Sequence, residues 1–157
     1  GTQMGPMARK DLMQELDKQV QDSIAEGARL VTGGKQLPGP GNFYPPTLLA
    51  DITPDMTCFQ QETFGPVTAL IKVKSAEEAI ELANSIDYGL GGSVWSKDVK
   101  KAEEVAMKLE TGQVFINAMT VSHPAIPFGG VKKSGFGREC GHYGIREFQN
   151  VKSVVIA

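Results

Sequence analysis

Two segments of this sequence have residue types and spacing that could contact a small ligand. The first, residues 61–66, places a carboxylate (Glu62), an aromatic ring (Phe64) and a Gly-Pro turn between two strand-like segments. A carboxylate accepts hydrogen bonds from hydroxyl groups and a ring supplies an apolar wall, so the loop could orient a ligand. On residue types alone a solvated turn is the better interpretation, because Glu is mostly exposed and a loop Phe usually covers the core.

The second segment, residues 127–139, reads PFGGVKKSGFGRE and is rich in glycine. Because it enters a predicted helix, its amide groups could cradle a phosphate. It lacks the preceding strand and GxGxxG spacing of a dinucleotide-binding turn. Tight turns and close backbone approach are the better interpretation of the glycines, and they would leave Arg138 and Glu139 as packing or ion-pair residues.

The composition narrows the function classes. The chain has 157 residues, a formal net charge of −2 and 41% hydrophobic residues, so no basic field attracts nucleic acid or an anionic membrane surface. No apolar stretch approaches the length of a membrane helix, and we expect a cytoplasmic protein. Cys58 and Cys140 have neither metal-ligand nor disulfide-framework spacing, so no metal site is predicted.

The positioning elements follow from hydrophobic periodicity. Apolar residues recur every four positions from Leu12, which predicts a helix over residues 7–26 that Gly27 closes. Ser75 and Glu78 have capping-box spacing and predict a second helix. A third helix is expected to begin near Val99 and to end before Gly112, and a fourth is expected over 138–148. Strands are expected at residues 29–32, 47–52, 67–73, 93–96, 113–117 and 151–156.

This alternation predicts an α/β fold with a parallel twisted sheet and flanking helices. The apolar run at residues 114–116 indicates a strand that is buried on both faces. We assign residues 1–149 to this domain. Residues 150–157 are assigned to a C-terminal strand for oligomerisation, because an edge strand invites a partner.

The two segments together resemble the aldehyde dehydrogenase family. Its hallmarks are an E-x-F-G-P loop and, downstream, P-F-G-G-x-K-x-S-G-x-G-R-E, and both are intact here. The resemblance extends to Gly5-Pro6, to N-x-x-x-Y-G-L at residues 84–90, to G-x-V-x-I-N at 112–117 and to Tyr143-Gly144. It therefore covers almost the whole chain and places it within the family's catalytic domain.

The resemblance implies NAD(P)-dependent oxidation of an aldehyde to a carboxylate through a cysteine thioester. The family's nucleophile, general base and oxyanion asparagine lie upstream of the region that this chain resembles, so we expect no catalytic residue here. Cys58 and Cys140 match no catalytic position and are interpreted as structural thiols. Glu62 resembles the glutamate that binds the nicotinamide ribose hydroxyls of NAD or NADP, and Phe64 resembles the ring at the nicotinamide end.

The resemblance also assigns substrate contacts. Residues 118–128 match the stretch that lines the family's substrate tunnel, with Ser122 in its middle and Phe128 at its end. Ser122 occurs where succinate-semialdehyde dehydrogenases carry a serine that binds the substrate carboxylate, which predicts a short acidic semialdehyde. His123 is interpreted as a surface residue. The longer protein is expected to form a homo-oligomer.

Two alternatives remain open. The chain could be a non-catalytic module that serves folding or oligomer contacts, since the chemistry is missing from it. It could also be a stand-alone nucleotide-binding domain, although no phosphate-binding turn supports this. Because it lacks an initiator Met, a fragment of a longer enzyme is the preferred interpretation, and alone it should aggregate or associate.

Overall fold

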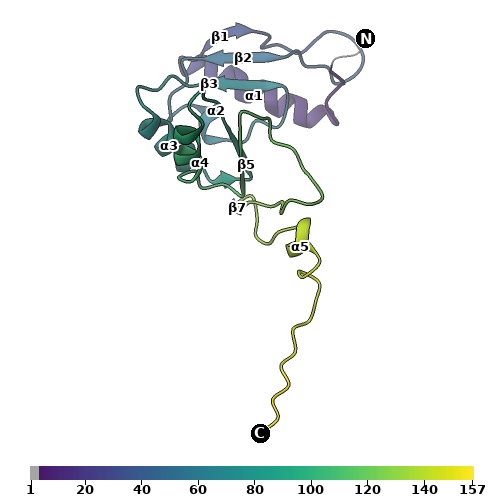
Figure 1. The fold of residues 1–157 in the computed structure, drawn as a ribbon. Coiled ribbons are helices and arrows are strands. Elements are labelled where there is room, and N and C mark those ends of the chain that lie inside the picture. Colours follow the sequence, from purple (N-terminus) through teal and green to yellow (C-terminus); the bar gives the residue numbers. More distant parts are fainter. Residues whose placement is uncertain (1–3) are drawn as a thin grey trace. The chain divides into compact units, whose positions relative to one another are not determined.

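The computed structural model describes residues 4–157, which form two compact units, one ending at Lys74 and the other beginning at Ser75. The first unit contains α1 (Lys10–Ala25), β1 (Arg29–Thr32), β2 (Thr47–Ala50), α2 (Thr57–Gln60) and β3 (Val67–Leu70). The second contains α3 (Ala76–Ser85), β4 (Tyr88–Gly89), β5 (Gly91–Val94), α4 (Val99–Ala106), β6 (Gln113–Ile116), β7 (Val131–Lys132) and α5 (Gly141–Gly144). Figure 1 traces these elements along the chain.

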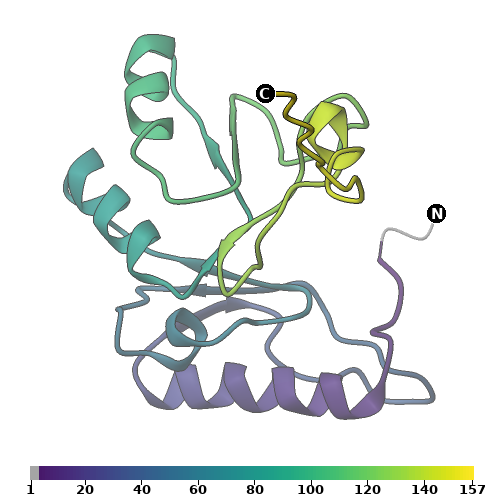
Figure 2. The same cartoon turned by 90° about the horizontal axis from the view of Figure 1, so that it is seen from below.

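In the first unit, α1 packs along one face of a three-stranded sheet (Figure 2). The helix buries Met13, Leu16 and Val20, which recur at helical spacing on one side. They meet Leu49 of β2 in the core, and Val67 and Ala69 of β3 pack against this cluster. The loop over residues 61–66 therefore runs from the end of α2 to the start of β3 in this sheet.

The start and end of α1 have different causes. Gly27 adopts a φ of +113° after the last turn, a conformation that suits glycine, and the predicted closure is confirmed. The helix begins at Lys10 rather than near residue 7, and Arg9 provides no side-chain cap.

The prediction of one parallel sheet is wrong in its details. Strands β2 and β3 are parallel, but β1 pairs with β2 in the antiparallel sense. In the second unit β5 and β6 form a parallel pair, whereas β4 and β7 form a separate antiparallel pair. Alternating strands and helices identify the α/β class, but partner choice depends on contacts that are distant in the sequence.

In the second unit, the predicted helix start at Ser75 is confirmed because the Ser75 hydroxyl accepts a hydrogen bond from the Glu78 amide at the start of α3. Helix α4 contacts both β5 and β6, and its Ala102 is buried. The residues of β6 are only half-buried, so the prediction of a strand buried on both faces is wrong. Within this unit, α4 covers the strand from one side.

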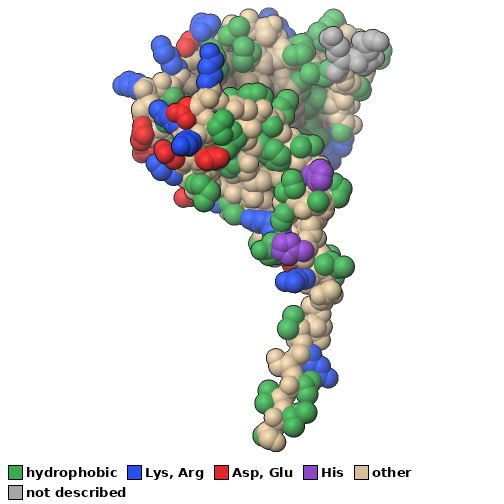
Figure 3. All heavy atoms as spheres, in the orientation of Figure 1, with side chains coloured by type: hydrophobic (Ala, Val, Ile, Leu, Met, Phe, Trp, Pro, Cys, Tyr) green, Lys and Arg blue, Asp and Glu red, His purple; other side chains and the backbone are tan. Residues whose placement is uncertain are grey.

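The C-terminal predictions are also corrected. The helix expected over residues 138–148 is limited to α5, because Cys140 and Gly141 have positive φ values and the chain continues in single turns after Gly144. No strand is found at residues 151–156. They are extended and exposed, and hydrophobic side chains occur along them (Figure 3). A strand needs a hydrogen-bonded partner, so pairing with another subunit stays a prediction.

Among residues 4–157, no helix is long and apolar enough to cross a membrane. Within the same residues, no group of His, Cys, Asp or Glu side chains is placed to hold a metal ion.

Candidate functional site

The loop that carries Glu62 and Phe64 is anchored to α1 by Gln19. This buried side chain donates hydrogen bonds from Nε2 to Gln61 Oε1 at 3.1 Å and to the Glu62 backbone oxygen at 3.2 Å. Pro66 extends the attachment, since its carbonyl accepts from the amide that begins β2 at 2.8 Å. The backbone of the loop is therefore fixed while the Glu62 side chain stays exposed.

Gly65 has a steric role in this loop. A Cβ at this position would approach Leu16 Cδ2 to 2.4 Å and Met7 Cε to 3.2 Å. Leu16 is almost completely buried, so a larger residue would move the loop away from α1. The rigid Gly-Pro turn that the sequence predicted therefore rests on close packing against the helix.

Glu62 and Phe64 border one hollow of about 260 Å³, which is also lined by Leu12, Glu15, Leu16 and Gln19. Phe64 is 74% exposed, an unusual state for a phenylalanine on a fixed loop. Within residues 4–157, no hydrogen bond or ion pair of the Glu62 carboxylate is found. An available carboxylate beside an exposed ring suits a ligand with paired hydroxyls and a flat face.

Ser122 and Phe128 also lie together, on a cavity of about 220 Å³ in the second unit. The backbone of Phe128 is fixed, because its amide donates to the Glu139 carbonyl at 2.7 Å and its carbonyl accepts from the Glu139 amide at 2.8 Å. The half-buried Phe128 and the exposed Ser122 both line this cavity. The sequence-predicted substrate pair thus shares one cavity.

The glycine-rich segment forms tight turns, in agreement with the preferred interpretation of its sequence. A Cβ on Gly112 would lie 1.6 Å from the carbonyl oxygen of Gly129, and one on Gly130 would lie 2.4 Å from Ser134 Cβ. The backbone just before β6 and the backbone of this segment therefore approach as closely as glycine permits. The following helix, α5, has only four residues, which removes the basis for a phosphate cradle on its amides.

Lys132 in this segment supports the end of α3, a role that the sequence did not indicate. Its Nζ donates to the carbonyl oxygens of Asn84 at 2.5 Å and Ile86 at 3.3 Å, and pairs with Glu110 Oε2 at 2.9 Å. The Asn84 carboxamide in turn accepts from the Glu110 amide and donates to the Lys108 carbonyl, each at 2.8 Å. These contacts join the turn after α3 to the end of α4.

The neighbours of Lys132 strengthen the same junction. The Ser134 hydroxyl accepts from the Gly89 amide at 3.0 Å, and the Lys133 amide donates to the Asp87 carbonyl at 2.9 Å. The Lys133 ammonium also pairs with the Asp87 carboxylate, which lowers the pKa of Asp87 and raises the pKa of Lys133, first through the hydrogen bond. Leu90, which lines the cavity with Ser122, follows this turn directly.

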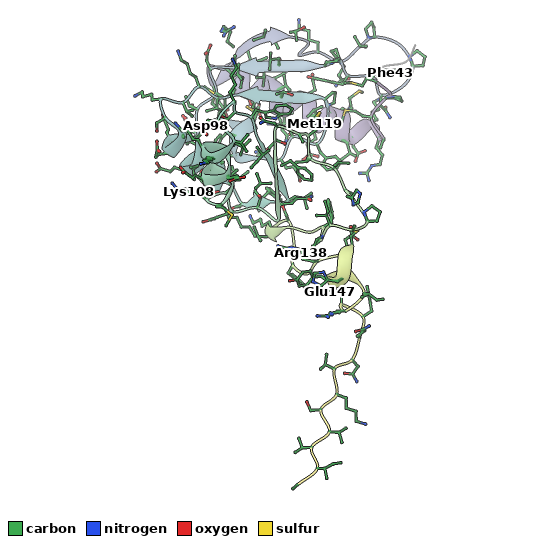
Figure 4. The ribbon with its side chains drawn as sticks, in the orientation of Figure 1. Phe43, Asp98, Lys108, Met119, Arg138 and Glu147 are labelled. Carbon is green, nitrogen blue, oxygen red and sulfur yellow. The ribbon has the colours of Figure 1, made fainter. Side chains whose placement is uncertain are left out.

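Arg138 contacts backbone and has no ion-pair partner among the described residues. Its Nη1 donates to the carbonyls of Gly130 at 2.8 Å and Gly137 at 2.7 Å. Its amide donates to Glu147 Oε1 at 3.1 Å, and Figure 4 shows the two labelled residues side by side near α5. Arg138 is thus a packing residue, one of the two roles that the sequence suggested.

The other candidate residues have structural surroundings. Cys58 is buried, and its amide donates to the Ser23 hydroxyl of α1 at 3.0 Å, which agrees with a structural thiol. Cys140 is half-buried beside α5. His123 is exposed, and its Nδ1 accepts from the Ala125 amide at 3.2 Å.

The comparisons with known proteins agree with these motifs. Residues 1–154 match the Aldehyde dehydrogenase family. The chain belongs to this family. A protein of Escherichia coli (strain K12) named succinate semialdehyde dehydrogenase (NAD(P)+) is 51% identical over 151 residues, which are 96% of this chain and 33% of that protein. A succinate-semialdehyde dehydrogenase (NADP(+)) of Mycobacterium ulcerans is 48% identical over 153 residues, or 98% of this chain and 33% of that protein.

Solved structures give the same family and fold. The succinic semialdehyde dehydrogenase of Streptococcus pyogenes in complex with NADP+ has a TM-score of 0.94 and 42% identity, over 99% of this chain and 34% of that one. A Mycobacterium tuberculosis aldehyde dehydrogenase complexed with NAD+ has the same TM-score and 41% identity, over 99% and 32%. This aldehyde dehydrogenase chain thus spans about one third of the length of these relatives.

Proposed function

We propose that the chain is the C-terminal part of an NAD(P)-dependent aldehyde dehydrogenase that oxidises a short acidic semialdehyde, succinic semialdehyde foremost, to a carboxylate. The observation that carries the proposal is the shared cavity of Ser122 and Phe128, the two residues assigned to the substrate. The succinate-semialdehyde dehydrogenases among the similar proteins support the substrate class.

The surroundings of Glu62 fit the nicotinamide ribose of NAD(P). The carboxylate is exposed, lacks a partner among the described residues and sits on a backbone that Gln19 fixes. It would accept two hydroxyl hydrogen bonds, and the exposed Phe64 ring would lie against the nicotinamide end. NAD(P), when bound, accepts the hydride that leaves the substrate. Glu62 and Phe64 would raise the rate of hydride transfer by orienting the nicotinamide of NAD(P).

We further propose that the nucleophilic cysteine, the general base and the oxyanion asparagine belong to an upstream part of the protein. Cys58 is buried and engaged with α1 through its backbone, which does not favour attack on an aldehyde. A cytoplasmic location and a homo-oligomer complete the proposal. The exposed apolar residues of the C-terminal segment support a partner, namely Val151, Val154, Val155 and Ile156.

The test is NAD(P)-dependent oxidation of succinic semialdehyde by the full-length protein and two variants. Glu62→Ala should weaken the response to NAD(P), since the ribose loses its acceptor. Ser122→Ala should raise the KM for succinic semialdehyde while the KM for butanal, which has no carboxylate, changes little. If neither variant alters these constants, the residue roles are refuted although the family assignment stands.

The non-catalytic alternative makes the opposite prediction. Its support is the exposed apolar C-terminal segment, which suits contacts with another chain. It predicts that the full-length protein has no aldehyde-oxidising activity with either NAD or NADP.

A further inference from the structure

The first residues of two paired strands form one part of the lining of the cavity that Ser122 and Phe128 share, and we call this part its floor. Gly91 begins β5 and lies directly opposite Gln113, the first residue of β6. Thr120 of the following loop completes the floor. Thr120 lies in the stretch over residues 118–128 that resembles the family's substrate tunnel, but Gln113 occupies an unspecified position of the G-x-V-x-I-N motif and could not be selected from it.

The absent side chain of Gly91 keeps this floor open. A Cβ there would lie 3.3 Å from Thr120 Cγ2, 3.5 Å from Gln113 Cγ and 3.7 Å from Gln113 Nε2. The φ of Gly91 is not positive, so any other residue could adopt the same backbone conformation. An added methyl group would therefore be tight against Thr120 Cγ2 and in ordinary van der Waals contact with Gln113, so it would fill part of the space between them.

The polar groups around the cavity are neutral hydrogen-bond donors. Gln113 contributes a carboxamide, while Thr120 and Ser122 contribute hydroxyls. Within residues 4–157, no hydrogen bond of the Gln113 carboxamide is found. The remaining lining is apolar or glycine, with Leu90, Val121 and Phe128 as its large members. This combination suits a short carbon chain that ends in a carboxylate.

We propose that Gln113 and Thr120 determine specificity by donating hydrogen bonds to the substrate carboxylate, and that Gly91 sets the depth of the cavity that receives it. This inference rests on the proposed function and names which residues of this chain would select an acidic semialdehyde. Ser122 then acts as one of three donors.

The first test compares kcat/KM for succinic semialdehyde and butanal in the full-length protein. Gln113→Met keeps the length of the side chain and removes the donor, and a lost hydrogen bond to a charged group predicts a decrease of roughly tenfold for succinic semialdehyde. Gln113→Glu adds a like charge and should lower it further. Thr120→Val provides a second, isosteric loss of a donor. With butanal, each variant should stay within about twofold of the wild type.

The second test uses two neighbouring glycines of β5. Gly91→Ala places a methyl group against Thr120 and Gln113 and should raise the KM for succinic semialdehyde severalfold. Gly92→Ala is the matched control, because a Cβ there meets only Leu109 Cδ1, at an ordinary 3.7 Å. Since side chains alternate along a strand, the control methyl group points away from the floor.

The outcomes separate this inference from the proposed function. If the wild type shows no preference for succinic semialdehyde over butanal, the substrate class fails and the inference fails with it. If the wild type has that preference but the variants of Gln113 and Thr120 keep it unchanged, only the present inference is overturned. Equal KM values in Gly91→Ala and Gly92→Ala would likewise refute the role of Gly91.

Discussion

Replacing Lys132 by methionine should loosen the junction between the ends of α3 and α4. The ammonium contacts two carbonyls at the end of α3, where carbonyls lack partners within the helix, and it also suits the negative end of the helix dipole. Its side chain is only 26% exposed, so water replaces these contacts poorly. Methionine keeps the Cβ and the chain length, so the strain of Lys132 at a φ of +55° is unchanged.

The expected loss follows from these contacts. The shorter hydrogen bond, to the Asn84 carbonyl, involves a charged group and should contribute about 1.5–3 kcal/mol. The bond to the Ile86 carbonyl is weak at 3.3 Å, and the pair with the exposed Glu110 carboxylate adds less than about 1 kcal/mol. We therefore expect the junction to lose about 2–3 kcal/mol. Local opening should become about 30- to 150-fold more frequent, since each 1.4 kcal/mol corresponds to a factor of ten.

Hydrogen exchange of the full-length protein measures this opening directly. The reporters are the amides of Gly89 and Glu110, which donate to Ser134 Oγ and Asn84 Oδ1 within the junction. Lys133→Met is the matched control, because its ion pair with Asp87 is exposed on both sides and should matter much less. Equal exchange rates at these amides in the two variants would refute the reasoning.

Two further predictions concern the first unit. Gly65→Ala should destabilise the protein by about 1–3 kcal/mol, because the new methyl group overpacks against buried Leu16; an unchanged midpoint of thermal unfolding would show that the loop is not held by this contact. Tyr44 is buried and its hydroxyl donates to Asp17 Oδ1 at 3.0 Å, and burial, followed by this hydrogen bond, holds the pKa of Tyr44 well above its usual value. The protonated Tyr44 hydroxyl therefore contributes fully to the stability of the fold below pH about 10, and this contribution is lost as the pH rises beyond that value. Tyr44→Phe should cost about 1 kcal/mol at neutral pH and flatten the alkaline decline of the free energy of unfolding, and the same alkaline slope in both proteins would contradict this.

The predictable parts of the fold depend on neighbouring residues. The Ser75 cap, the strand Arg29–Thr32 and the closure of α1 at Gly27 all follow from local patterns, and all three are confirmed. Each of these signals needs only a few adjacent residues, whose preferred conformations agree with the final structure.

The features that sequence reasoning missed depend on distant residues. Helix α2 was not predicted because its first turn is capped from α1: Glu26 accepts from the Thr57 amide at 2.6 Å, and Ser23 accepts from the Cys58 amide at 3.0 Å. Strand pairing likewise depends on which segments meet after folding. The glycines at residues 135–144 favour turns over the predicted helix, since Gly135, Gly137 and Gly141 have positive φ values.

The residues of the candidate site also fall into two groups, those that the sequence could identify and those that it could not. Glu62, Phe64, Ser122 and Phe128 could be selected because they belong to, or lie between, motifs of the family. Gln113 could not, because its place on the cavity arises from the register of β5 with β6. A single glutamine at the start of a strand carries no signal of its own.

Replacing both cysteines of this chain, as Cys58→Ala and Cys140→Ala together, tests in the full-length protein whether the nucleophile lies elsewhere. We propose that another part of the protein carries the nucleophile, and both thiols have structural surroundings here. The double variant should therefore still oxidise succinic semialdehyde, with a burst of NAD(P)H formation of the same amplitude per active site as the wild type. Loss of that burst in a variant that remains folded would refute an upstream nucleophile, because a cysteine of this chain would then form the thioester.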